Sequence, residues 1–313
     1  MPYHYLPAAN ASELIQQIAS VVADAGWTIT HYQTGSTEWL VLKHAQTNYL
    51  HLTASSSDTV LLNCTRDFSS SGGFSGQTNG FRINNNANTH TKAVAEVLPT
   101  LSAHIFVGTD PAPYLHVAWE VQPGYYRHIN IGALDLFVQG FNATFFDTVN
   151  NPNAGAAGNS YTDYYGLSVI SNSNIYSTVS NTGGLDFFDS EQNLAFYATN
   201  DSGTSYRRGG CALSDVDTMY GVGPNNITGR TLLNPLEYFC NTIDGLMAVG
   251  VVPNMNYVNI TYYDAGDEVT VGSDVWKIFP LIRKGEPVRE NTGGSYGYDS
   301  EFTKFLGFAY LKD

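Results

Sequence analysis

Pairs of acidic residues are the first candidates for chemistry in this sequence. A glycosidase needs two carboxyl groups about 5–9 Å apart in a cleft, and Phe187-Phe188 directly after Asp186 would suit a sugar-binding site. The competing interpretation places these acids in turns beside Gly and Asn. Asp267-Glu268 fits that interpretation, because it follows Gly266 at the start of a predicted strand. We favour turns for all three pairs, which are Asp186 with Asp189, Asp215 with Asp217, and Asp267 with Glu268.

The histidines do not have the spacing of a metal site. His116 and Glu120 are four residues apart, but in a predicted strand that spacing places them on one face about 13 Å apart. A zinc ion needs three or four ligands, each about 2 Å from one point. The sequence therefore predicts no metal ion. The eight histidines are His4, His31, His44, His51, His90, His104, His116 and His128.

Motifs for a nucleophile or a phosphate group are also missing. Gly73-Phe74-Ser75-Gly76 is one residue short of the Gly-x-Ser-x-Gly elbow of hydrolases. No Gly-x-x-x-x-Gly-Lys loop occurs, and no Gly-x-Gly-x-x-Gly lies between a predicted strand and a predicted helix. We therefore expect no catalytic residue and no cofactor, and we interpret the chain as a protein that is not an enzyme.

The composition favours a protein that works through contacts with other proteins. Only 13% of residues are charged, about half the ~25% of an average soluble domain. Charged residues are depleted and Tyr and Trp are enriched at protein–protein contacts. The net charge of −14 argues against binding to nucleic acid or to an anionic membrane surface. The odd number of widely spaced cysteines (Cys64, Cys211 and Cys240) indicates folding in a reducing compartment.

One helix is strongly predicted near the N-terminus. Asn10 can cap it, Glu13 stands three residues later as in a capping box, and Gly26 is the expected residue after its end. Apolar residues recur between these signals at helical spacing. They are Leu14, Ile15, Ile18, Val21, Val22 and Ala25.

Most of the remaining chain is predicted to form short β-strands. A Ser-, Gly- and Asn-rich segment, 67–91, is predicted as a long loop. Lys92–Leu98 is predicted as a weak helix or an extended stretch. Four strands are expected before the loop: Trp27–Tyr32, Glu38–His44, Asn48–Ala54 and Thr59–Thr65. Eight are expected after residue 100: His104–Gly108, Tyr114–Val121, Tyr125–Ala133, Leu194–Thr199, Tyr257–Tyr262, Glu268–Val271, Val275–Phe279 and Gly307–Lys312.

These elements predict an α+β fold that is mainly β. We place a boundary near residue 100, between a small α+β domain (1–100), made of the helix and an antiparallel meander, and a larger β-rich domain (101–313) resembling a sandwich or barrel. A single composite domain is the alternative.

The best-patterned segment, Gly266–Pro280, serves architecture rather than chemistry. It predicts a hairpin, which Gly307–Tyr310 would complete as a closing strand. Trp276 and Phe279 are its predicted buried anchors, and Trp119 and Tyr310 are further candidate anchors.

Aromatic doublets such as Tyr125-Tyr126 suggest a surface for subunit contact. Successive side chains in a strand point to opposite faces, so each doublet would place one ring in the core and the other outward or in a second interface. An outward ring would suit subunit contact or, as the alternative, carbohydrate stacking. The candidate interface residues are Tyr125, Arg127, His128, Arg207 and Arg208.

The segment Pro123–Asp135, which contains Tyr126-Arg127-His128 and Gly132, resembles a segment of virion structural proteins of tailed bacteriophages. In that family an aromatic-Arg-His stretch is followed by a Gly- and aromatic-rich tract, and here Phe137–Thr148 stands in that place without the usual Gly doublet. The segments that follow in the family's order are Asn225–Pro235, Val252-Pro253-Asn254, Gly266–Pro280 and Gly307–Tyr310.

The resemblance covers residues 110–313 and implies a tail, neck or baseplate component without catalytic residues. Such a protein would be assembled in the host cytoplasm and built into the virion, in a hexameric or trimeric ring of copies of itself against other virion proteins. The alternative hypothesis is a glycan-binding or glycan-cleaving β-protein of a tail tip or a cell-surface system, because such proteins share the enrichment in Tyr, Asn and acids.

Overall fold

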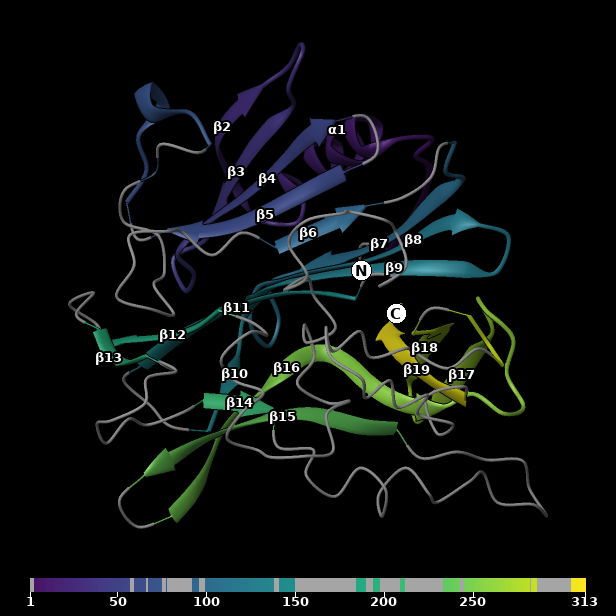
Figure 1. Cartoon of the computed structure of the whole chain (residues 1–313). Helices are drawn as coiled ribbons and strands as arrows, with labels where there is room; N and C mark the ends of the chain where they lie inside the picture. The colour runs from purple at the N-terminus through teal and green to yellow at the C-terminus, as the bar shows by residue number, and fades with distance from the viewer. Residues whose placement is uncertain are drawn as a thin grey trace, which may run out of the picture.

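The computed structural model has one α-helix and three antiparallel sheets in the part of the chain that it describes (Figure 1). This architecture confirms the predicted α+β, mainly β fold. The described residues are 3–56, 59–65, 67–74, 77, 92–95, 99–137, 141–149, 184–189, 194–197, 209–211, 233–242, 245–281, 283–285 and 305–313.

The helix α1 (Ala11–Val22) begins as the sequence predicts. The side chain of Asn10 accepts a hydrogen bond from the Glu13 amide at 2.9 Å. The Glu13 carboxylate accepts a hydrogen bond from the main-chain amide of Ala9 at 2.9 Å, and not from the main-chain amide of Asn10 as in a standard capping box. The chain before the helix is therefore held as well. The apolar face of α1 is buried against β4 and against β1 and β7.

The N-terminal sheet has the strand order β2-β3-β4-β5-β6. Its strands match the predicted meander to within one or two residues, and Lys92–Ala95 is a strand, as the extended alternative for that stretch predicted. A short 3-10 helix, η1 (Ser70–Gly72), follows β5. The strands are β2 (Thr28–Gln33), β3 (Trp39–Lys43), β4 (Tyr49–Ser56), β5 (Thr59–Thr65) and β6 (Lys92–Ala95).

The central sheet has the order β1-β7-β8-β9-β11-β12-β13. Its first strand comes from the N-terminus, because Tyr3 to Pro7 pair antiparallel with Phe106 to Ser102. The strands are β1 (Tyr3–Pro7), β7 (Ser102–Gly108), β8 (Tyr114–Gln122), β9 (Tyr125–Ala133), β11 (Phe141–Val149), β12 (Gly184–Asp189) and β13 (Leu194–Tyr197).

The C-terminal sheet has the order β14-β15-β16-β19-β18-β17, and β10 (Asp135–Leu136) pairs with β16 beside it. The predicted hairpin is present, and in it Glu268 faces Lys277 and Val271 faces Asp274. The strands are β14 (Gly209–Cys211), β15 (Leu233–Thr242), β16 (Gly245–Asn259), β17 (Glu268–Val271), β18 (Asp274–Pro280) and β19 (Leu306–Leu311).

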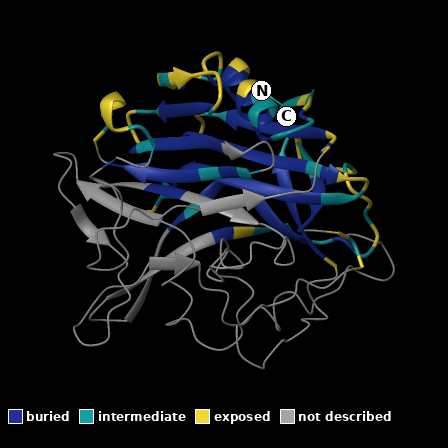
Figure 2. Ribbon diagram, turned by 45° about the horizontal axis from the view of Figure 1, so that its top comes forward, coloured by how far each residue is buried: buried dark blue, intermediate teal, exposed yellow. Residues whose placement is uncertain are grey.

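The central sheet is covered on both faces, and its strands alternate accordingly. On one face of β7 and β8, Ile105 and Val117 join a core with α1 and the inner side of the N-terminal sheet. On the other face, Phe106 and His116 meet Tyr310 of the C-terminal sheet, with ring centroids 5.0 and 5.3 Å from it. Most residues of β7, β8 and β9 are buried, and Figure 2 shows buried residues in the strands across the middle of the described part.

The boundary expected at residue 100 does not separate two cores. β1 lies in the central sheet, and one apolar cluster runs from Ala8 and Leu14 through Leu52 to Val117 and Ile131. The physical reason is that the helix and the N-terminal sheet close their core only against the central sheet. For these residues the structure favours the single composite domain over the 1–100 and 101–313 division.

Two glycines, Gly132 of β9 and Gly307 of β19, mark close backbone approaches. A Cβ on Gly132, whose φ is +157°, would lie 2.3 Å from the Pro113 carbonyl oxygen. A Cβ on Gly307 would lie 2.4 Å from the Phe279 carbonyl oxygen and 2.6 Å from a methyl of Ile260. A side chain at either position would force β8 or β18 away from its neighbour.

We predict that Gly307→Ala lowers the free energy of unfolding by ~1–3 kcal/mol, because overpacking displaces β18. Chemical denaturation monitored by fluorescence measures this. Gly72→Ala is the control, since a Cβ there would meet only atoms of Gln77 at 3.8 and 3.9 Å, which is ordinary contact. Equal losses in the two variants would contradict the proposed clash.

Candidate functional site at the interface of the central and C-terminal sheets

The most distinctive polar cluster in the described residues lies inside the molecule, between the central and C-terminal sheets. It contains His116 of β8, His128 and Asn130 of β9, and Tyr310 of β19, all at most 1% exposed. We call these four residues the sheet-interface network. Strand alternation puts His128 and Asn130 on the same face of β9, and the pairing of His116 with Asn130 in register brings β8 alongside.

Each histidine of the network binds a main-chain carbonyl of the C-terminal sheet. His116 Nε2 lies 2.8 Å from the Pro253 oxygen, and His128 Nε2 lies 3.0 Å from the Pro280 oxygen. A carbonyl oxygen can only accept, so both Nε2 atoms carry a proton. In a neutral ring this leaves Nδ1 of each histidine as an acceptor that needs a donor.

Tyr310 and Asn130 provide those donors. The Tyr310 hydroxyl lies 2.8 Å from His128 Nδ1 and donates to it. One terminal atom of the Asn130 amide lies 3.0 Å from His116 Nδ1 and 3.3 Å from the Tyr310 oxygen, and the other terminal atom has no partner.

The amide nitrogen of Asn130 fits the first of these two positions. An NH₂ group there donates one hydrogen to His116 Nδ1 and the other to Tyr310, whereas an oxygen would face the lone pair of His116 Nδ1. The hydrogen bonds then run in one consistent direction from Asn130 through Tyr310 and His128 to Pro280, and from Asn130 through His116 to Pro253.

Burial keeps both histidines neutral. Desolvation lowers the pKa of His116 from 6.5 to about 4, against the opposing effect of the hydrogen bond to the Pro253 carbonyl. Desolvation likewise lowers the pKa of His128 to about 3, and the neighbouring positive charge of Arg127 adds to it. With both nitrogens of each ring engaged in the interior, the network holds two sheets together and offers no base to a substrate.

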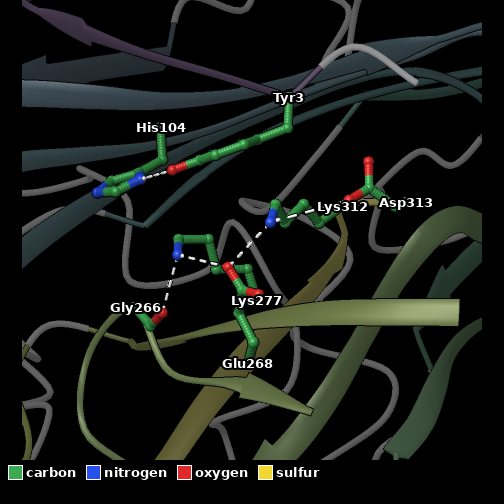
Figure 3. Close-up of polar contacts among 7 residues, drawn as sticks. All are labelled: Tyr3, His104, Gly266, Glu268, Lys277, Lys312 and Asp313. Atoms are coloured by element: carbon green, nitrogen blue, oxygen red, sulfur yellow. Dashed lines mark hydrogen bonds and ion pairs between the residues drawn. The ribbon is translucent and has the colours of Figure 1, made fainter. Parts of the chain in front are cut away.

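A second polar cluster joins the two ends of the chain (Figure 3). The Tyr3 hydroxyl lies 2.7 Å from His104 Nδ1, and Lys277 Nζ and Lys312 Nζ lie 5.5 and 5.9 Å from the Tyr3 ring centroid. Both lysines contact Glu268 Oε1 at 3.2 Å. The cluster ties β1, the edge of the central sheet, to β17, β18 and β19.

The ionisation of this terminal cluster follows from burial and from the two lysines. Burial raises the pKa of Tyr3 to about 12 and lowers the pKa of His104 to about 4. The hydrogen bonds from Lys277 and Lys312 lower the pKa of the Glu268 carboxyl. Tyr3 is therefore a neutral donor to a neutral His104, and Glu268 is an ionised partner of both lysines.

Three of the four predicted anchors are fully buried. Phe279, Trp119 and Tyr310 are each 0% exposed. Trp276 is only partly buried, and it packs against a smaller cluster that includes Ile278 on the opposite face of the C-terminal sheet.

The prediction that Arg127 and His128 lie at an interface with another subunit is wrong. Arg127 and His128 are 2% and 0% exposed, so neither presents a surface to another subunit. The reason is the double cover of the central sheet: successive side chains of β9 point to opposite faces, and both faces are packed. The signal that could have shown this is that β8 has apolar residues at both odd and even positions, such as Val117 and Ala118, so that neither of its faces is polar throughout.

The remaining interface candidates are only partly described. Tyr125 is half-buried, and its hydroxyl accepts a hydrogen bond from Arg283 at 2.6 Å, with the guanidinium 4.6 Å from its ring centroid. Its neighbour Tyr126 is buried against Phe279, so this doublet divides between two faces. Arg207 and Arg208 lie outside the described residues.

The three acidic pairs lie in different settings. Asp267 accepts a hydrogen bond from the Asp264 amide at 2.7 Å, as the turn interpretation predicted. The turn interpretation is wrong for Asp186 and Asp189, which belong to the strand β12, and Asp215 and Asp217 lie outside the described residues. Within the described ranges, no three His, Cys, Asp or Glu side chains gather as metal ligands, and no helix there is long and apolar enough to span a membrane.

Comparison with protein-family models and with curated proteins identifies no relative of this chain. No protein-family model matches the chain, and no curated protein matches its sequence.

We predict that Tyr310→Phe lowers the free energy of unfolding by ~1–3 kcal/mol, because it leaves buried groups of His128 and Asn130 unpaired. Denaturant unfolding at pH 7.5 measures this. Tyr262→Phe, at a tyrosine that is 57% exposed, should change stability by no more than ~0.5 kcal/mol. A neutral effect of Tyr310→Phe would show that the network does not hold the sheets.

Proposed function

We propose that this chain is a structural subunit of a tailed-phage virion, in the tail, neck or baseplate. It works by packing against copies of itself and against other virion proteins in a hexameric or trimeric ring. Assembly in the host cytoplasm precedes its incorporation into the particle.

The observation that carries the proposal is the meeting in space of the segments that resemble virion proteins. His128 of Pro123–Asp135 binds Tyr310 of Gly307–Tyr310 at 2.8 Å and the last residue of Gly266–Pro280 at 3.0 Å. Pro253, from a further segment, binds His116. Motifs separated by more than a hundred residues thus form one packed interior, as expected where a family pattern preserves architecture.

The surface supports a role in assembly. Several large apolar side chains are exposed, including Tyr5 (60%), Phe137 (56%) and Tyr262 (57%). Only 13% of the residues in the chain are charged, and charged residues are depleted at protein–protein contacts. Identical subunits with two different complementary surfaces close into a ring when the rotation between them permits.

The experiment is complementation of a phage that lacks this chain, with the chain supplied from a plasmid and the particles purified. We predict that mass spectrometry finds the chain in the particles and that a particle reconstruction places it in a symmetric ring. Presence in the lysate as a monomer, with absence from particles, would refute the proposal.

The variant Asp267→Asn separates this function from glycan cleavage. It keeps an oxygen for the Asp264 amide but removes the carboxylate, so we predict normal incorporation and plating. A loss of plating together with a loss of polysaccharide cleavage by the purified chain would support the glycan-cleaving alternative instead.

A further inference from the structure

Three buried histidines of the central sheet all face the C-terminal sheet. His116 and His128 donate to the carbonyls of Pro253 and Pro280. His104 packs on Phe279, with ring centroids 4.7 Å apart. Contact between the two sheets is therefore made in large part by rings that must stay neutral.

Among the described residues, the groups around these histidines include no carboxylate that would compensate for a positive charge. Around His116 and His128 they are Tyr114, Asn130 and Tyr310, with the positive Arg127 next in sequence. Around His104 they are Tyr3, Tyr5, Tyr126 and the positive Lys277.

The nearest described carboxylates on these elements are engaged elsewhere. Glu120 accepts hydrogen bonds from Ser102 and Gly124. Glu268 is bound by the two lysines of the terminal cluster.

Protonation would also break the hydrogen-bond order of the network. A proton on His128 Nδ1 or His116 Nδ1 would face the hydrogens of Tyr310 or Asn130, so that two donors oppose each other. A buried charge without an opposite charge beside it is costly to keep out of water, even though each Nε2 keeps its bond to a proline carbonyl. Each charged ring gains water when the C-terminal sheet moves away from the central sheet.

The core on the other side of the central sheet is not built on histidines that acid would protonate. The core that this side forms with α1 and the N-terminal sheet consists of apolar residues such as Leu14, Leu52 and Ile105. His51 lies on the far face of the N-terminal sheet, bonded to Thr65 at 2.7 Å, outside that core.

We propose that the interface of the central and C-terminal sheets is an acid-operated latch. On acidification β16, β18 and β19 separate from the central sheet, while the core around α1 stays packed. This inference does not depend on the virion proposal.

The pH window follows from linkage. The pKa values of His104 and His116 are about 4 and that of His128 about 3 in the closed form, and they return toward 6.5 when the rings reach water. The open form then binds more protons. Closure is fully favoured above pH 6.5 and is progressively lost as the pH falls from 6.5 toward 4.

Pulsed hydrogen–deuterium exchange tests the latch. The full chain is held at pH values from 7.5 to 4, labelled briefly at one fixed pH, and analysed by peptide. We predict that 274–281 and 305–311 lose protection at least about tenfold at a higher pH than 11–22 and 103–107 do. Simultaneous loss in all four peptides, or no loss, would overturn the proposal.

Variants assign the effect to the histidines. His116→Gln and His128→Gln keep a donor for the proline carbonyls but cannot be protonated, so the opening midpoint should fall by about one pH unit. Tyr310→Phe removes the partner of neutral His128 and should raise the midpoint, which provides a test if the glutamine variants do not fold. His4→Gln, on β1 outside the interface network, should match the wild type; an equal shift there would overturn the assignment.

Discussion

The neutrality of His116 and His128 is the constraint on which the arrangement of the sheets depends. Each ring uses one nitrogen to bind the C-terminal sheet and the other to accept from Tyr310 or Asn130. Only uncharged rings, both protonated at Nε2, satisfy all these bonds. Burial enforces that state, and the hydrogen bonds in turn fix the distance and register between two sheets that share no strand.

The double cover of the central sheet explains why the chain forms a composite unit. Its apolar face completes the core of α1 and the N-terminal sheet, and its aromatic and polar face completes the C-terminal sheet. Neither outer layer buries its inner face without the central sheet. The terminal cluster of Tyr3, Lys277 and Lys312 adds a second connection, and it brings the two ends of the chain together.

Local signals predicted the local structure well. The cap at Asn10, the strands of the first meander and the Glu268–Val271 hairpin strand all follow from short-range patterns. β15 and most of β16 were missed because Pro235 and Pro253 interrupt their patterns, and the pairing of β15 shifts register beside Pro235. The interface network could not be predicted, because its partners are up to 182 residues apart and only the sheet order brings them together. For the same reason the sequence predicts Arg127 and His128 at an interface, whereas both lie in the interior because both faces of β9 are covered.

The most direct test of the interface network is the protonation state of its histidines. Nitrogen NMR of histidine-labelled protein at pH 7 distinguishes a protonated ring nitrogen from an unprotonated one. The account predicts that His116 and His128 are both protonated at Nε2 only, and that neither titrates until the pH is well below 6.5. A ring protonated at Nδ1, or a histidine of the network that titrates near its ordinary pKa of 6.5, would contradict it.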